Sequence, residues 1–205
     1  MPHQNRVTPS GEIIATLDRG TFFGNRGLLH NAQRRIVRPF KVTRWLICLL
    51  EFKGRHRPIM APGQYTELFF LDEATALAAG HRPCAECRRL AYDHFRRCWI
   101  AAHGAPGDKL PTAGAMDDAL HRDRLMPNGT KRTYQADLAT LPDGVFVLID
   151  DEPWLLWQAA LHHWTPGGYD LRRPRPSSGP ATVLTPRHTV AVIAAGYTPA
   201  VQHAT

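Results

Sequence analysis

The chain has no long hydrophobic run. Its longest apolar stretch covers only residues 45–50, whereas a membrane-spanning helix needs about 20 such residues. A membrane partner is therefore not expected, and the stretch is interpreted as a buried strand. No apolar segment follows residues 1–6 either. We therefore expect no secretory signal and a cytoplasmic location.

Cysteine is also scarce, with 4 residues among 205. In a reducing compartment, so few cysteines are typical of free thiols or metal ligands rather than of disulfides. Hydrophobic residues make up 43% of the chain and charged residues 21%, which is close to the composition of an ordinary globular protein. A chain of this length buries enough apolar surface to fold without a disulfide framework.

Acidic residues are outnumbered, since 18 Asp and Glu face 25 Lys and Arg and leave a net charge of +7. The imbalance is strongest over residues 26–57, where Glu51 is the only acid. Such a stretch favours a polyanionic partner such as nucleic acid, although a solvated basic face has the same composition. The candidate nucleic-acid contacts are Arg34, Arg35, Arg38, Arg44, Arg55 and Arg57.

Common catalytic signatures are missing as well. The chain contains neither the Gly-x-Ser-x-Gly of α/β hydrolases nor the His-Glu-x-x-His of zinc proteases. The glycine-containing residues 21–27 are interpreted as a turn. They do not form a phosphate loop, because no Gly-Lys-Ser/Thr follows them. Catalytic residues are therefore left unassigned.

One motif points to specific chemistry, the Cys-x-x-Cys formed by Cys84 and Cys87. At the start of a helix, this spacing brings both sulfurs to one side, where they suit a zinc ion with four tetrahedral ligands at about 2.3 Å from sulfur. The flanking Arg82 and Arg88 are expected to lower the pKa of both thiols. A second cysteine pair is absent, so the motif supplies half of a site, and two buried thiols are the alternative.

The remaining ligands have to come from elsewhere in the chain. On a continuous helix, His94 lies about 10 Å beyond Cys87 along the axis, which is too far to share an ion. Cys98 lies still farther along the same helix. The predicted zinc ligands are Cys84, Cys87, His56 and Cys48, with His30 and His81 as further alternatives.

Residues 68–88 also resemble a known module. They run Leu-Phe-Phe-Leu-Asp-Glu-Ala-Thr-Ala-Leu-Ala-Ala-Gly-His-Arg-Pro-Cys-Ala-Glu-Cys-Arg. This is similar to the Phe-Phe…Glu-Ala…Gly-x-Arg-Pro-Cys-x-x-Cys stretch of the Ada-type zinc-binding module of alkylation-repair and related bacterial proteins. The resemblance covers about a tenth of the chain. It implies that Cys84 and Cys87 are zinc ligands.

One part of that family's pattern is missing. Its first ligand pair, a Cys-x-x-x-Cys or His-x-x-x-Cys farther upstream, is matched only in spacing, because Met60 stands where a cysteine should follow His56. In the family, one cysteine of this pair accepts a methyl group from a DNA phosphotriester. That chemistry is not expected here. Cys48 lies in an apolar strand and is interpreted as a buried thiol, not as an acceptor.

The order of the segments predicts an α+β protein. Residues 1–104 are expected to form a small antiparallel sheet with the Cys-x-x-Cys helix packed on it. Residues 105–140 are expected to be a linker with a short helix, and residues 141–205 a β-rich C-terminal lobe. A single core shared by the two halves is compatible with this order.

Local signals place several elements of the N-terminal half. Strands are expected within residues 42–52 and 65–71, which are rich in β-formers. Asp72 is expected to cap a short helix that ends at Gly80. Pro83 is expected to be the first residue of the next helix.

Two functions fit these features. The first is a zinc-stabilised nucleic-acid-binding protein, associated with DNA repair or processing by resemblance and without methyl-acceptor chemistry. The alternative is a small metal- or histidine-dependent enzyme that acts on a small molecule in a cleft between the two lobes. Salt-dependent binding to DNA would support the first function. Saturable stabilisation by a small ligand would support the second.

Overall fold

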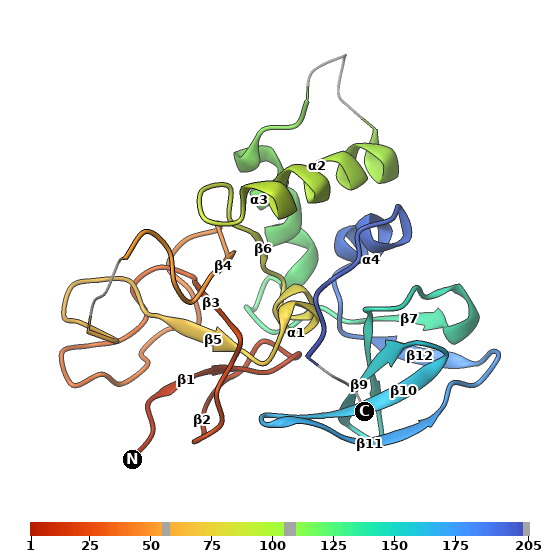
Figure 1. Cartoon of the computed structure of the whole chain (residues 1–205), viewed down its shortest axis with the longest axis horizontal. Helices are drawn as coiled ribbons and strands as arrows, with labels where there is room; N and C mark the ends of the chain where they lie inside the picture. Colours follow the sequence, from red (N-terminus) through yellow and green to blue (C-terminus); the bar gives the residue numbers. More distant parts are fainter. Residues whose placement is uncertain (55–57, 105–109, 203–205) are drawn as a thin grey trace.

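The computed structural model describes residues 1–54, 58–104 and 110–202. These residues form two six-stranded sheets and four α-helices, which confirms the α+β class. In Figure 1 the N-terminal sheet lies on the left and the C-terminal sheet on the right, with the helices between and above them.

The N-terminal sheet is mixed rather than antiparallel, which corrects the expected topology. Its strands, in spatial order, are β2 (Ile13–Ala15), β1 (Gln4–Val7), β5 (Leu68–Phe70), β3 (Phe22–Asn25), β4 (Leu46–Cys48) and β6 (Arg82–Pro83). The pairs β1–β5 and β4–β6 are parallel, and the other neighbours are antiparallel. Two parallel strands can be joined only by a long connection, because the chain has to return to the end of the sheet where the first strand began. Local sequence patterns do not show which strands such a connection brings together.

The expected turn over residues 21–27 is wrong, because its centre forms strand β3. An isolated glycine usually weakens a strand, but at Gly24 the neighbouring strand leaves no room for a side chain. A Cβ atom on Gly24 would lie 1.9 Å from the backbone oxygen of Leu46 in β4. Glycine therefore permits the close pairing of β3 with β4.

Helix α1 (Glu73–Ala78) begins and ends as predicted. The Oδ1 atom of Asp72 accepts a hydrogen bond from the backbone N–H of Thr75 at 2.8 Å, which satisfies one of the unpaired donors at the helix start. Gly80 adopts a φ of +93°, in the left-handed region where helices commonly end at glycine.

Helix α2 (Arg89–His103) begins later than predicted. Pro83 pairs with Ile47 within the sheet, so the Cys-x-x-Cys segment lies in the turn between β6 and α2 rather than in the first turn of the helix. The helix packs mainly against β6 and against α4 (Arg187–Ala194). Helix α3 (Ala113–Arg124) also contacts α4.

The β-rich C-terminal lobe is confirmed. Its sheet is antiparallel, with the spatial order β11 (Gly168–Pro174), β10 (Ala160–Thr165), β9 (Glu152–Trp157), β8 (Phe146–Ile149), β12 (Pro180–Val183) and β7 (Tyr134–Asp137). A 3₁₀ helix, η2 (Leu138–Thr140), follows β7. Asp150 and Asp151 join β8 to β9 with positive φ angles of 54° and 62°, as a tight hairpin turn requires.

One hydrophobic core serves both lobes. Val7 and Phe70 of the N-terminal sheet belong to the same buried cluster as Val147 and Leu156 of the C-terminal sheet. Phe95 of α2 adds to this cluster. Helix α1 contacts strands of both sheets, β5 and β8, so the two lobes share their interior.

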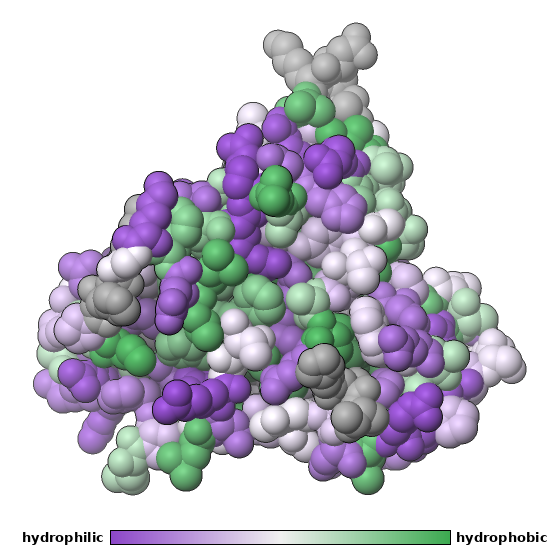
Figure 2. All heavy atoms as spheres, viewed as in Figure 1, coloured by the Kyte–Doolittle hydropathy of each residue, from purple (hydrophilic) through white to green (hydrophobic). Residues whose placement is uncertain are grey.

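The surface mixes polar and apolar side chains. Figure 2 shows hydrophobic groups among hydrophilic ones on the face turned to the viewer, including a cluster over the N-terminal lobe on the left. The large exposed hydrophobic side chains of that lobe include Leu17, Val37, Leu50 and Ile59. Within the described ranges, no helix combines the length and the apolar character needed to cross a membrane.

Candidate metal centre and adjoining cavity

Three of the four cysteines meet at one edge of the N-terminal sheet. Cys48 ends β4, and Cys84 directly follows β6. Because these parallel strands pair Ile47 with Pro83, the next residues along both strands are neighbours. Cys87 lies in the following turn, and the sulfur atoms of the three cysteines are within 4.8 Å of one another. This cluster is therefore close enough to hold one metal ion.

A tight turn brings Cys87 back toward Cys84. The backbone N–H of Arg88 donates to the carbonyl oxygen of Cys84 at 3.1 Å. The N–H of Glu86 donates to the sulfur of Cys84 at 3.4 Å. Backbone donors aimed at a sulfur favour its thiolate form. The Cys-x-x-Cys spacing thus brings two sulfurs together in a turn, although the helix itself starts later.

Two buried ion pairs hold this turn from either side. Before the turn, Arg82 donates two hydrogen bonds to Asp117 of α3, at 2.8 and 2.7 Å. After the turn, Arg88 donates to Glu73 of α1 at 2.7 Å. Carboxylates pair with both guanidinium groups, so these arginines position the turn. Arg88 also interacts electrostatically with Cys87, but the largest cause of the shifts in thiol pKa is another cysteine.

The three thiols shift one another's pKa values instead. The pKa of Cys84 is lowered to about 5, chiefly by a hydrogen bond with Cys48 and further by two backbone N–H groups, while burial opposes the shift. The Cys48 thiol also lowers the pKa of Cys87, with help from the N–H of Leu49. Hydrogen bonds to these two sulfurs, together with burial, raise the pKa of Cys48. These shifts favour a proton on Cys48 and the thiolate form of Cys84, and the thiolate is the form that binds metals.

The two alternative histidine ligands belong to the interior instead. His30 is buried, and its Nδ1 is hydrogen-bonded with the hydroxyl of Thr66 at 2.7 Å. His81 is buried between Arg26, which donates to its Nε2 at 2.9 Å, and the carbonyl of Leu46, which lies 3.1 Å from its Nδ1. Burial and the Arg26 charge lower the pKa of His81 well below its usual value. Both side chains are committed to other partners.

The other predicted ligands have different outcomes. His56, the first choice for a third ligand, lies outside the described residues. Cys48, the next choice, does join the cluster. His94 packs against Tyr197 with 5.3 Å between ring centroids, and Cys98 is buried in the shared core. Neither of these two reaches the cluster, in agreement with the helix spacing.

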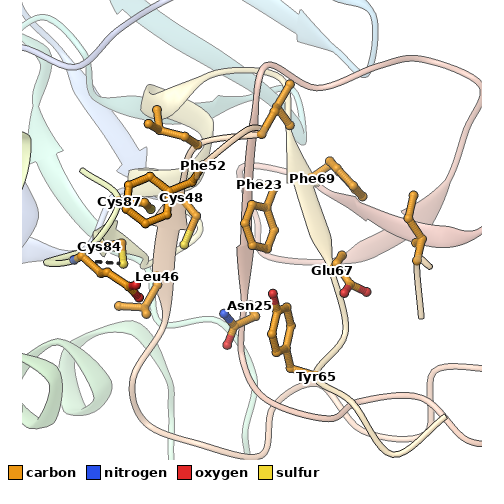
Figure 3. Close-up of a pocket in the computed structure, with 14 residues that line it drawn as sticks. Phe23, Asn25, Leu46, Cys48, Phe52, Tyr65, Glu67, Phe69, Cys84 and Cys87 are labelled. Carbon is orange, nitrogen blue, oxygen red and sulfur yellow. Dashed lines mark hydrogen bonds between the residues drawn. The ribbon is translucent and has the colours of Figure 1, made fainter. Parts of the chain in front are cut away.

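A cavity of about 370 Å³ opens beside the cysteines on one face of the N-terminal sheet (Figure 3). Successive side chains of a strand point to opposite faces, and every second residue of three neighbouring strands lines this cavity. These residues are Leu46 and Cys48 of β4, Phe23 and Asn25 of β3, and Phe69 of β5 with Glu67 just before it. The intervening Ile47 and Leu68 are fully buried on the opposite, core side, as is Phe70, which follows Phe69.

One row of side chains leads from the cysteines to aromatic rings. Phe23 pairs with Cys48 on one side and with Phe69 on the other. The ring of Tyr65 stacks against that of Phe23, with 6.3 Å between centroids and 19° between planes. At the far end, the guanidinium of Arg6 lies 4.7 Å from the centre of the Phe69 ring. This half-buried row is suited to planar and cationic groups, which pack favourably on aromatic rings.

The second row carries polar groups. Asn25 pairs with Leu46 of β4. On the other side, Gly24 pairs with Leu68 in the antiparallel pair β3–β5, so the next residues, Asn25 and Glu67, are neighbours. The Oε2 atom of Glu67 accepts a hydrogen bond from the N–H of Met60 at 2.8 Å. Among the described residues, its buried Oε1 has no hydrogen-bond partner. No Lys, Arg or His is among the described residues of the cavity lining.

The predicted nucleic-acid contacts that the structure describes lie on the segment between β3 and β4. We call residues 31–44 the basic loop. Asn31 orders one end of it, since its Oδ1 accepts hydrogen bonds from the N–H groups of Gln33 and Arg35 at 3.0 Å each. The exposed candidates in this loop are Arg34, Arg35, Arg38 and Arg44. Arg55 and Arg57 lie outside the described residues.

Arg26 does not belong to this surface, although the sequence groups it with the same basic stretch. Its guanidinium is buried 4.0 Å from the centre of the Trp45 ring. Arg124 lies 3.9 Å from the same ring. Burial lowers the pKa of Arg26 to about 9. Part of the positive charge in the sequence therefore contributes to packing rather than to a binding surface.

Comparison with known proteins adds no relative. No protein-family model, no curated protein and no solved structure matches this chain. The Ada-type resemblance over residues 68–88 therefore stays a resemblance of one segment. Three cavity residues, Phe23, Asn25 and Glu67, were not predicted from the sequence. Their alternating spacing was visible, but only the pairing of the strands brings them together.

Proposed function

We propose that the chain is a zinc-stabilised protein that binds single-stranded nucleic acid. The observation that carries the proposal is the row of half-buried rings, Phe23, Tyr65 and Phe69, in the same half of the chain as the exposed basic loop. Bases of a single strand stack on aromatic side chains while basic side chains bind the phosphates. The Ada-type resemblance supports a role in DNA repair or processing, without methyl-acceptor chemistry.

Zinc has a structural role in this proposal. A tetrahedral ion with bonds of about 2.3 Å to sulfur places its sulfur ligands about 3.8 Å apart. Sulfurs that already lie within 4.8 Å of one another reach this spacing with small side-chain rotations. We assign Cys48, Cys84 and Cys87 as ligands and keep His56 as the proposed fourth. The ion would tie β4 to the turn before α2 and so support one wall of the cavity.

Metal analysis and cobalt substitution test the zinc assignment. We expect about one zinc per chain after purification without chelator. Cobalt(II) in its place should show the absorption bands of a tetrahedral thiolate site, and His56→Ala should change them. His121→Ala is a matched control, because the His121 ring packs on Phe40 away from the cysteines. A metal-free protein whose thiols react freely while it is folded would refute the assignment.

Binding of a labelled single strand and of its duplex tests the nucleic-acid assignment. Bases in a duplex are paired and stacked, so only the single strand reaches the rings. Phe23→Leu should weaken single-strand binding roughly ten-fold, since one base–ring stack contributes about 1–3 kcal/mol. Phe22→Leu is the matched control, because Phe22 is the adjacent residue in β3 and belongs to the core side.

Two results would contradict this function. One is equal affinity for the duplex and the single strand, with no loss in Phe23→Leu. The other is the absence of binding at about 50 mM salt, where phosphate contacts are strong. Fluorescence anisotropy at increasing salt measures both affinities.

A small-molecule enzyme is the second candidate, and one observation favours it. The three cysteines line a cavity that also contains Glu67 and Glu86, and a metal with three protein ligands and one open position is typical of catalytic sites. This cavity lies in the N-terminal half, not between the lobes where the sequence suggested a cleft. Added imidazole should change the cobalt(II) spectrum if the fourth position is open. An unchanged spectrum would favour the structural role.

A further inference from the structure

We infer that Glu67 and Asn25 make the cavity selective for guanine. This inference rests on the proposed single-strand binding and specifies which base enters the cavity. The two side chains are neighbours at the ends of β3 and β5, beside the ring of Phe23 on which a base would stack. They therefore contact the edge of a base whose face lies on the aromatic row.

Glu67 is a buried carboxylate with one oxygen left unpaired. The residue is only 6% exposed, yet its Oε1 has no partner among the described residues. A buried polar atom without a hydrogen bond is costly, and such atoms in native structures call for an explanation. A ligand with N–H donors would satisfy this oxygen. Glu67 lines the cavity in which such a ligand would lie (Figure 3).

The backbone next to Glu67 holds the carboxylate in place. Met60, which donates its N–H to Oε2, has a φ of 53°, a conformation that residues other than glycine rarely adopt. Met60 itself is fully buried. The fold thus binds one carboxylate oxygen with a constrained backbone donor and leaves the other oxygen for a ligand.

The charge pattern indicates a base in the cavity and phosphates outside it. The buried carboxylate of Glu67 lines the cavity and would repel an anionic phosphate placed beside it. Cations instead pack on the outer rings. Arg6 lies 4.7 Å from the centre of Phe69, and the Nζ of Lys53 lies 5.1 Å from the centre of Phe52. A strand that inserts one base would place its phosphates near such cations.

The donors and acceptors on the two side chains match guanine best. A carboxylate only accepts hydrogen bonds, and guanine presents two adjacent donors, N1–H and the 2-amino group, beside the acceptor O6. The Oδ1 of Asn25 accepts from the N–H of Gly27 at 3.4 Å, which leaves the amide NH₂ as a donor for O6. Adenine and cytosine present a ring-nitrogen acceptor where guanine has N1–H. Thymine and uracil offer one donor instead of two.

Four otherwise identical single strands test the inference, with guanine, inosine, adenine or cytosine at one central position. Guanine should bind roughly ten-fold more tightly than adenine, the discrimination typical of a bidentate base contact. Inosine lacks the 2-amino group and should fall between them. Glu67→Gln should abolish the preference for guanine while keeping the salt dependence of binding. Glu51→Gln, which changes an exposed acid, is the matched control and should keep the preference.

A second variant covers the case in which Glu67→Gln does not fold. Asn25→Ala removes the proposed O6 donor and leaves the Glu67–Met60 hydrogen bond in place, so it should also reduce the preference for guanine. Guanosine and adenosine as free nucleosides form a separate arm, measured by thermal shift of the wild type and of both variants. Selective stabilisation by guanosine in the wild type alone would support the cavity contact independently of any strand.

The outcomes separate this inference from the proposed function. If all four strands bind equally and the variants change nothing, the guanine inference is overturned and single-strand binding stands. If no strand binds but guanosine selectively stabilises the wild type, the proposed function is overturned and the guanine site is supported. If neither strands nor guanosine bind, both are overturned.

Discussion

Adjacent residues of the N-terminal sheet have opposite roles. Phe70 and Ile47 are fully buried in the core that the two lobes share. Phe69 and Cys48, their neighbours in sequence, face the cavity. Residue type does not separate the members of these pairs; the pleat of the strand does. One face of the sheet belongs to the shared core, and the other borders the cavity.

The largest effect should come from dismantling the proposed metal site on the cavity face. When the free concentration of a bound ion is about 1,000 times its Kd, loss of the binding site lowers the free energy of unfolding by about 4 kcal/mol. We expect Cys84→Ser to approach that loss, and Cys98→Ser, which removes a buried thiol from the core, to cost about 1 kcal/mol. Chemical denaturation with metal analysis of each variant measures both. Equal losses would mean that Cys84 is an ordinary packing residue.

The next effect separates the two faces directly. Phe70→Ala should cost about 3–5 kcal/mol of unfolding free energy, as expected for a fully buried ring. Phe69→Ala should cost about 1 kcal/mol, because the ring is only half-buried. Under conditions where both variants are folded, Phe69→Ala should weaken single-strand binding more than Phe70→Ala. A larger stability loss for Phe69→Ala would invalidate the assignment of the two faces.

A smaller effect concerns the protons of the cysteine cluster. In the metal-free protein the pKa of Cys84 is about 5, so its alkylation rate should be nearly constant around neutral pH. Cys48→Ala removes the main cause of this shift, and the midpoint of the rate profile should move upward. An unchanged midpoint in Cys48→Ala would show that the backbone donors alone lower the pKa.

The same shift has a defined effect on stability. Between the folded pKa of about 5 and the higher unfolded value, the unfolded state binds more protons at Cys84 than the folded state. The stability of the metal-free protein should therefore rise with pH over this range and be lost as the pH falls through about 5. Thermal melts at a series of pH values, with Cys84→Ala as the control that lacks this group, measure the trend.

The smallest effect should come from the basic loop. Replacing Arg34 and Arg35 with alanine removes two phosphate contacts, so the log–log salt slope of single-strand binding should fall by about 1.4. The melting temperature should stay nearly constant, because both side chains are exposed. The control pair Arg97→Ala and Arg172→Ala removes exposed charge elsewhere and should leave the slope unchanged. A slope that changes equally in both pairs would reflect net charge alone.

Features that depend on neighbouring residues could be predicted from the sequence. The Asp72 cap and the Gly80 helix end are such features, because each involves residues within one helical turn. The closeness of Cys84 and Cys87 follows in the same way from their spacing. Features that depend on strand pairing could not be derived in this way. Cys48 was named as a candidate ligand, but the parallel pairing of β4 with β6 that brings it to the cluster was not predicted.

The cavity was missed for a related physical reason. Its central strand contains Gly24, which by itself indicates a turn. Glycine is needed there because a side chain would collide with the backbone oxygen of Leu46, a residue on another segment. Arg26 was misjudged because the arginines that follow it in sequence are exposed, whereas its ring partner Trp45 lies on a different segment. Both errors concern contacts between segments that are distant in sequence.

The Glu73 carboxylate has a consequence for how the protein is made. This carboxylate holds Arg88 beside the cysteine turn, and it is itself bound by the hydroxyl of Tyr197 at 2.6 Å, across 124 positions, and by the N–H of Ala200 at 3.1 Å. A ribosome produces these partners long after the cysteines have emerged. The turn therefore gains its last supports only late in translation.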